Sequence, residues 1–133
     1  MKFMLDTNIC IYIIKQKPVK VIERFTQYSP GDILISSITI AELRYGAEKS
    51  LHVLQNHDAL NGFIIPLEVA AFDEKAADEY GKVRAMLERK GQSIGSMDMI
   101  IGAHALSLGV TLVTNNTKEF KRIRGLKVEN WTK

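Results

Sequence analysis

The sequence is poor in cysteine: Cys10 is the only one among 133 residues. A lone thiol cannot form an internal disulfide, so the chain is not a disulfide-stapled secreted scaffold. Cys10 lies in the apolar run Ile9–Ile14, which favours a small buried side chain in a reducing compartment. No zinc pattern exists either, because His52 and His57 fall on different helix faces and His104 stands alone.

Long apolar runs are missing as well. No stretch approaches the roughly 20 apolar residues of a membrane-spanning helix. Residues 1–6 contain four apolar side chains before the carboxylate of Asp6, which is too few for the apolar region of a secretory signal. A cytoplasmic protein without a membrane partner is expected. There is also no phosphate-binding loop, no nucleophile elbow, no internal repeat and no flexible linker, and the length fits a single domain over 1–133.

The formal charge of +3 is only mildly basic. It does not by itself indicate a nucleic-acid partner, but many of the cations are clustered, most densely around Lys121 and Arg122 near the C-terminus. Such a cluster is either a solvated surface or a patch that holds a phosphate backbone. Both interpretations stay open, and Lys121 and Arg122 are candidate contacts to an RNA backbone.

Periodicity predicts strands that alternate with helices. This order is typical of an α/β fold with a parallel sheet covered on both faces, whose ligand sites lie beyond the carboxyl ends of the strands. Strands are expected at Lys2–Leu5, Ile33–Ile35, Leu67–Phe72, Val110–Val113 and Leu126–Val128, and helices at Asn8–Lys15, Val19–Tyr28, Ser37–Ser50, Val53–Ile65, Glu74–Arg89, Gly95–Leu108 and Thr117–Arg122.

Two carboxylates occupy positions that are not expected of solvent-exposed surface acids. Asp6 follows a buried strand directly, at the expected ligand edge, although it is also a good helix cap. Helical spacing places Glu42 on a stripe with Ile38, Ala41 and Tyr45, which is interpreted as the inward face. An inward glutamate is costly unless it is paired or binds a metal. The alternative for Glu42 is an ion pair with a cation such as its neighbour Arg44.

A third carboxylate, Asp98, lies in a first helical turn whose apolar face is Ile101, Ala105 and Leu108, with Gly102 beside it. Placement near the positive end of the helix dipole explains an acid there equally well. Three inward acids together would repel one another unless a cation neutralises them. Hard divalent cations take oxygen ligands, so the set favours an ion such as Mg²⁺ acting on a phosphate.

Four segments resemble the motifs of PIN-domain toxins of the VapC type. They span nearly the whole chain in order, and the first two are fairly specific in combination. The segments are Met4–Asn8, Ser36–Gly46, Gly95–Asp98 followed by Ile100–Ala105, and Thr114–Asn116 with Glu119 and Phe120.

The resemblance implies an α/β/α sandwich on a parallel sheet and an endoribonuclease that depends on Mg²⁺ or Mn²⁺. It also implies a type II toxin that acts on RNA, with tRNA as one option, is inhibited by a cognate VapB-like antitoxin and usually forms a homodimer. By this resemblance Asp6, Glu42 and Asp98 are the metal-binding acids.

The fourth motif departs from the family pattern, because Asn116 stands where many members carry an aspartate. Asn116 can still offer a carbonyl oxygen, and Glu119, one turn on, can supply the charge. Thr7 and Thr114 are expected to position water or a phosphate, with ordinary capping and turn chemistry as the alternative.

Two other functions stay open at this point. One is a metal-dependent phosphohydrolase for small molecules, although Asp6-Thr7-Asn8 lacks the second aspartate of the haloacid-dehalogenase-like pattern. The other is a catalytically silent module that binds RNA or protein, for which the three acids would need a purely structural reason.

Overall fold

The computed structural model describes residues 2–133. Met1, the first residue of the predicted domain, lies outside the described residues. Strands alternate with helices as expected, and most predicted bounds hold within a few residues. The elements are β1 (Phe3–Leu5), α1 (Thr7–Lys15), α2 (Val19–Thr26), a short 3₁₀ turn η1 (Pro30–Asp32), β2 (Ile33–Ser36), α3 (Ser37–Glu48), α4 (Val53–Ile64), β3 (Glu68–Ala70), α5 (Glu74–Arg89), α6 (Ser96–Leu108), β4 (Thr111–Val113), α7 (Thr117–Phe120) and β5 (Val128–Glu129).

The strands form one sheet in the order β3-β2-β1-β4-β5, and every neighbouring pair is parallel. The predicted α/β class is therefore confirmed. The chain builds outward from β1 to β2 and β3, and then returns to place β4 on the other side of β1. The chain leaving β1 crosses toward β2, whereas the chain leaving β4 crosses toward β5 on the other side. Between β1 and β4 this opens a crevice, which is where ligands of such sheets bind.

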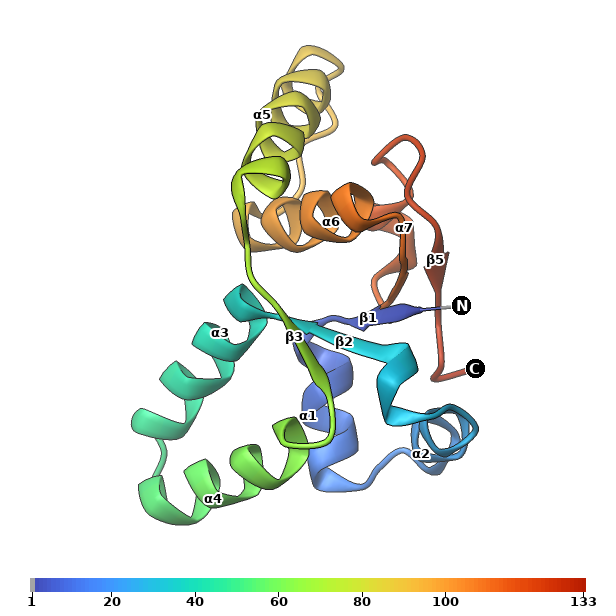
Figure 1. Cartoon of the computed structure of the whole chain (residues 1–133). Helices are drawn as coiled ribbons and strands as arrows, with labels where there is room; N and C mark the ends of the chain where they lie inside the picture. The colour runs from blue at the N-terminus through green and yellow to red at the C-terminus, as the bar shows by residue number, and fades with distance from the viewer. Residues whose placement is uncertain (1) are drawn as a thin grey trace.

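Side chains alternate across the sheet and build a core on each face. Phe3 and Leu5 of β1 pack on one side with residues of α1, α2 and α4, whereas Met4 packs on the other with residues of α5, α6 and α7. Figure 1 shows these two helical layers on opposite sides of the strands. No helix within residues 2–133 has both the length and the apolar character needed to cross a membrane.

The predicted inward stripe of α3 is wrong. Ala41 is exposed and Tyr45 is 66% exposed, whereas Thr39, Leu43 and Ala47 are buried. The helix is rotated so that this second set, four residues apart, faces the core. Leu108, also assigned to an inward face, is 44% exposed. Helical spacing alone did not locate the buried face where apolar residues occur all round the helix.

The last segments also differ from expectation. β3 and α7 are shorter than predicted, and β5 begins at Val128 rather than Leu126. The chain after α7 lies along α6 instead of forming regular structure, with Ile123 buried against it. A methyl group added at Gly102 would lie 2.5 Å from Ile123 Cδ1 and 3.3 Å from the ring of Phe120. Gly102 therefore allows this close packing of α7 on α6.

Gly102→Ala is expected to destabilise the protein by about 1 kcal/mol, since both neighbours are buried and cannot move aside freely. The control is Gly81→Ala in α5, where an added methyl group meets nothing within 4 Å. Helix propensity alone then predicts a gain of roughly 0.5–1 kcal/mol. Urea unfolding of both variants measures the difference, and equal gains in both would show that Gly102 is not a packing constraint.

Candidate metal centre

Asp6 is the residue that joins β1 to α1. Its backbone N–H donates to the Val113 carbonyl at 3.0 Å, which continues the β1–β4 pairing by one residue. Its side chain caps α1 by accepting from the Ile9 N–H at 2.9 Å, and it is 7% exposed. The cap interpretation is thus correct, but it uses only part of the carboxylate. Asp6 lies at the carboxyl edge of the sheet, at the switch between β1 and β4.

Thr114 follows β4 on the neighbouring side of the same crevice. Its hydroxyl hydrogen-bonds the Asp6 carboxylate and accepts from the Asn116 N–H at 2.9 Å. The Thr114 side chain has no exposed surface. Its role in positioning water or a phosphate stays a prediction. Because Thr114 is buried, we expect it to act on such a group indirectly, by orienting Asp6.

Glu42 reaches the crevice from α3, which follows β2. It is half-buried, and the Thr7 hydroxyl donates to its Oε1 at 2.6 Å. None of the ion pairs among residues 2–133 involves Glu42, and Arg44 instead bonds His57 and Asn61 of α4. The ion-pair explanation for Glu42 is therefore wrong, and Thr7 supplies its hydrogen bond without neutralising its charge.

Asp98 enters from the first turn of α6 and completes the set. A hollow of about 190 Å³ lies between the acids, lined by Asp6, Thr7, Asn8, Glu42, Asp98 and Ile101. On its far side, the Asn116 amide donates to Glu119 Oε2 at 3.1 Å and also hydrogen-bonds Asp98. Asn116 and Glu119 therefore do share a face, as predicted, and the amide N–H₂ group separates two carboxylates.

The acids raise one another's proton affinity. Burial is the largest cause that raises the pKa of Asp6, to about 6, and the charges of Asp98 and Glu42 add to it. Hydrogen bonds from Thr114 and from the Ile9 backbone act in the opposite direction. Burial also raises the pKa of Asp98, together with the charges of Glu119 and Glu42. No basic side chain among residues 2–133 contributes to either shift, so neither carboxylate is neutralised by an ion pair within this range.

The donor set fits a hard divalent ion. Carboxylate, hydroxyl and amide oxygens from several elements face one hollow. A cation there would offset both the burial and the repulsion that raise the pKa values of Asp6 and Asp98. As the side chains lie, no three acidic, histidine or cysteine groups among residues 2–133 converge tightly enough to enclose an ion. Glu42 is turned to Thr7, and the Asn116 amide is turned to Glu119.

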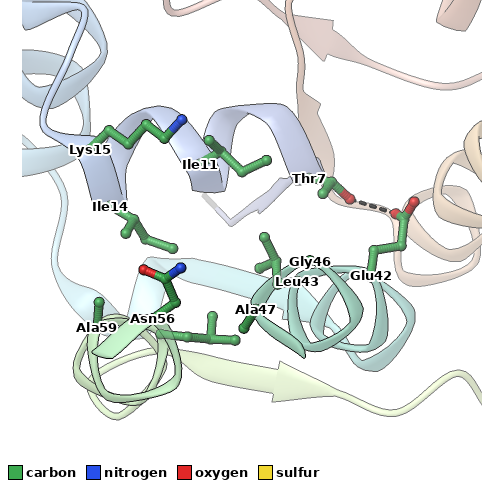
Figure 2. A pocket seen from close by; sticks show the side chains of 11 residues that line it. Thr7, Ile11, Ile14, Lys15, Glu42, Leu43, Gly46, Ala47, Asn56 and Ala59 are labelled. Carbon is green, nitrogen blue, oxygen red and sulfur yellow. Dashed lines mark hydrogen bonds between the residues drawn. The ribbon is translucent and has the colours of Figure 1, made fainter. Parts of the chain in front are cut away.

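An apolar groove of about 270 Å³ adjoins the acids (Figure 2). It runs between α1 and the α3–α4 pair, and Thr7 and Glu42 belong to both the groove and the acidic hollow. The other lining side chains are Ile11, Ile14, Lys15, Leu43, Gly46, Ala47, Asn56, Ala59 and Leu60. The sequence analysis did not predict this groove.

The two candidate RNA contacts follow α7. Lys121 is exposed, and the Arg122 guanidinium donates to the Ser93 carbonyl at 3.2 Å. Ser93 lies in the loop between α5 and α6, so this bond ties the segment after α7 to the loop that leads into the helix of Asp98. A further polar contact escaped the sequence analysis: His104, set aside as isolated, hydrogen-bonds Ser36 at the start of α3. A histidine among the small apolar residues of a helix was the available signal.

Comparison with known proteins identifies the family. The PIN domain family model matches residues 3–126. The chain belongs to the PIN-domain family. It is 48% identical over 132 residues, 99% of both chains, to a protein of Shigella flexneri named tRNA(fMet)-specific endonuclease VapC. It is 50% identical to the protein of the same name from Salmonella typhimurium, with 98% of each chain covered. Within the family, the chain belongs to the VapC ribonucleases.

Solved structures agree with this assignment. The DNA-bound VapBC complex of Salmonella typhimurium contains a chain that matches with a TM-score of 0.93 at 50% identity, and 98% of both chains is covered. The VapBC2 complex of Rickettsia felis, bound to a DNA fragment from its promoter, gives a TM-score of 0.92 at 44% identity over 98% of this chain and 99% of that one. The expected PIN-like α/β/α architecture is confirmed.

For this VapC-family chain, the shifted Asp6 predicts a pH dependence of stability. Below pH 3.8 the carboxyl is neutral in both the folded and unfolded states. As the pH rises toward 6 the unfolded chain ionises first, so folding loses about 3 kcal/mol from Asp6 by pH 7.5. Asp6→Asn keeps the cap, because asparagine also caps helices well, and removes this loss.

Urea unfolding in the presence of a chelator tests the effect. Asp6→Asn is expected to be more stable than the parent at pH 7.5, and the difference should shrink at pH 4. Asp73→Asn is the matched control, since Asp73 caps α5 in the same way but is exposed. A loss of stability in Asp6→Asn at pH 7.5 would show that capping, not the cost of burying the charge, dominates at this position.

Proposed function

We propose that the chain is the toxin of a type II toxin–antitoxin pair, an endoribonuclease that hydrolyses RNA phosphodiester bonds with Mg²⁺ or Mn²⁺. One domain over 1–133 carries the activity. The observation that supports this most is the meeting of Asp6, Glu42 and Asp98 at one hollow of the carboxyl edge, in a chain similar over its full length to VapC ribonucleases.

The acids and their neighbours have distinct tasks. Asp6, Glu42 and Asp98 would hold the ion, and Thr114 and Thr7 fix the carboxylates of Asp6 and Glu42. A bound divalent ion supplies positive charge that activates water and stabilises the charge that develops at phosphorus. This chain's own residues determine where that happens, because the backbone fixes all three carboxylates. Asp6 joins β1 to α1, Glu42 lies within α3, and Asp98 lies in the first turn of α6.

The fourth position is held by a pair rather than by one acid. Asn116 separates Asp98 from Glu119 in the metal-free site, and Glu119 contributes the negative charge that Asn116 lacks. A cation near Asp98 would reduce the repulsion between Asp98 and Glu119, as the Asn116 N–H₂ group does in its absence. The pair therefore does the work of the aspartate that many relatives carry there.

The partners follow from the relatives. Solved complexes of similar chains are VapBC pairs, and we propose a VapB-like antitoxin and a homodimer for this protein too. Two of the similar proteins are named for tRNA(fMet), which makes a tRNA the proposed substrate. Single-stranded loops of folded RNA present their backbone and bases to such a site. Neither the small-molecule phosphohydrolase nor the silent binding module has a comparable observation in its favour.

Cleavage of tRNA tests the proposal directly. The purified protein should cut tRNA in Mg²⁺ or Mn²⁺ and not in excess chelator, and Asp98→Asn should lower the rate by at least about 100-fold, equivalent to roughly 2.7 kcal/mol. Asp78→Asn, an exposed acid of α5, is the control and should cut normally. Unchanged cleavage by Asp98→Asn, or cleavage that persists in chelator, would contradict the assignment.

The fourth position makes a separate prediction. Glu119→Gln is expected to weaken cleavage more than Asn116→Ala does, because only Glu119 adds a charge that attracts the ion. The difference should be largest at limiting Mg²⁺ and should shrink at saturating Mg²⁺. If Glu119→Gln cuts normally at limiting Mg²⁺ while Asn116→Ala does not, Asn116 alone fills this position.

A third prediction concerns the proposed RNA backbone contacts Lys121 and Arg122. In an Asp98→Asn background, RNA affinity should fall as salt rises, and replacing both cations with glutamine should reduce the slope of log affinity against log salt by about 1–2. The same double change at exposed Lys75 and Lys82 of α5 is the control. A slope that responds only to the control pair would move the RNA path to α5.

A further inference from the structure

His104 is a buried ionisable side chain that the proposed chemistry does not use. It lies in α6, downstream of Asp98 in the same helix, and has no exposed surface. Burial is the largest influence on its pKa and lowers it, against the opposing effects of the Asp73 charge and the Ala71 backbone. The ring is therefore held in its neutral form, with one nitrogen protonated and the other free to accept.

The ring makes one short contact with the junction between β2 and α3. His104 Nδ1 lies 2.8 Å from Ser36 Oγ. Ser36 is itself buried and caps α3, since its Oγ accepts from the Ile38 N–H at 3.1 Å. If Ser36 donates to Nδ1, both groups are satisfied. The opposite tautomer would leave the Ser36 hydroxyl proton without a partner in a dry site, which is costly.

The ring proton is accordingly placed on Nε2. The Ala71 backbone interacts with the imidazole and raises its pKa, but Nε2 completes no hydrogen bond of good geometry within the described residues. The Phe72 and His104 rings pack nearly perpendicular to each other, with their centroids 5.3 Å apart. The Phe72 N–H donates to Ser37 Oγ at 3.1 Å. The contact to Ser36 is therefore the polar interaction that holds the ring in its orientation.

This hydrogen bond connects the helices that carry two of the acids. Ser36 begins α3, which carries Glu42, and α6 carries both Asp98 and His104. Asp98 precedes His104 by as many residues as Glu42 follows Ser36. The charge of Glu42 raises the proton affinity of Asp98, so the two acids repel each other across the hollow. A tie between their helices opposes that repulsion in the metal-free protein.

We propose that His104 is a positioning residue whose hydrogen bond to Ser36 sets the spacing between Glu42 and Asp98, and so sets the affinity for the divalent ion. This inference rests on the metal-dependent function proposed above. His104 acts through Ser36 and α3 and does not touch the ion or the RNA. Groups that hydrogen-bond the metal ligands directly commonly change the affinity by 10–100-fold when they are removed. His104 acts one step further out, through Ser36 and α3, so the lower end of that range is expected.

Two substitutions separate the hydrogen bond from packing. His104→Phe keeps a ring of similar size against Phe72 and removes the acceptor. His104→Asn loses the ring but places an amide oxygen near the position of Nδ1. If the bond positions the acids, His104→Phe weakens Mn²⁺ binding about tenfold, whereas His104→Asn stays within about threefold of the parent. A purely structural role predicts the reverse order, because packing favours the aromatic ring.

The measurement is calorimetric titration of Mn²⁺ into the purified protein, with thermal melts of the metal-free variants alongside. His52→Gln, an exposed histidine before α4, is the control and should bind Mn²⁺ like the parent. Ser36→Ala should weaken Mn²⁺ binding as His104→Phe does, and the double variant should lose nothing further. If His104→Phe fails to fold, the Ser36→Ala variant alone tests whether the Ser36–His104 hydrogen bond affects Mn²⁺ affinity.

Two outcomes overturn the inference. One is a His104→Phe or Ser36→Ala variant that binds Mn²⁺ with the parent's affinity. The other is a His104→Asn variant that binds as weakly as His104→Phe. Absence of Mn²⁺ binding by the parent protein would instead overturn the proposed metal-dependent function, and this inference with it. Normal Mn²⁺ binding by the parent together with an unaffected Ser36→Ala variant would leave the proposed function in place and remove only the role of His104.

Discussion

Burial of several carboxylates close together at the carboxyl edge of the sheet is the constraint on which this structure depends. Asp6 and Asp98 both bind protons more tightly than ordinary carboxyls, chiefly because they are buried, and each feels the charge of Glu42. Hydrogen bonds from Thr114 and from the Ile9 backbone hold Asp6 in place, and the Thr7 hydroxyl holds Glu42. Buried acids held in this way are typical of functional sites, which supports the metal site proposed above.

The topology explains why the acids meet at all. Parallel strands bring their carboxyl ends to one edge, and the switch between β1 and β4 opens that edge beside Asp6. The helices that follow β1 and β2 start there, and α6 directs its first turn at the same place. Small or hydroxyl-bearing residues then set the fine spacing. Thr114 orients Asp6, Thr7 orients Glu42, and Gly102 lets α7 bring Glu119 near Asp98.

Much of this arrangement could be read from the sequence, and the failures have physical causes. The alternation of strands and helices and the position of Asp6 after a buried strand follow from local patterns. The inward face of α3 could not be predicted in this way, because apolar residues occur on all sides of that helix. Tertiary packing buries Thr39 and Leu43 and leaves Tyr45 exposed. Contacts between distant segments, such as Ser36 with His104 or Thr114 with Asp6, leave no periodic signal. Asn116 and Glu119 were paired correctly because they lie one turn apart in the same segment.

The most direct test of the central claim is the position of a divalent ion in crystals of the protein soaked in Mn²⁺, located by its anomalous scattering. The account predicts one strong peak in the hollow between Asp6 and Asp98, with carboxylate oxygens roughly 2.0–2.3 Å from the ion and Glu42 turned toward it directly or through water. Occupancy should be lost in Asp98→Asn crystals. A peak elsewhere on the protein, or an empty hollow at saturating Mn²⁺ with the three carboxylates unchanged, would contradict the claim that these acids are held together to bind a metal.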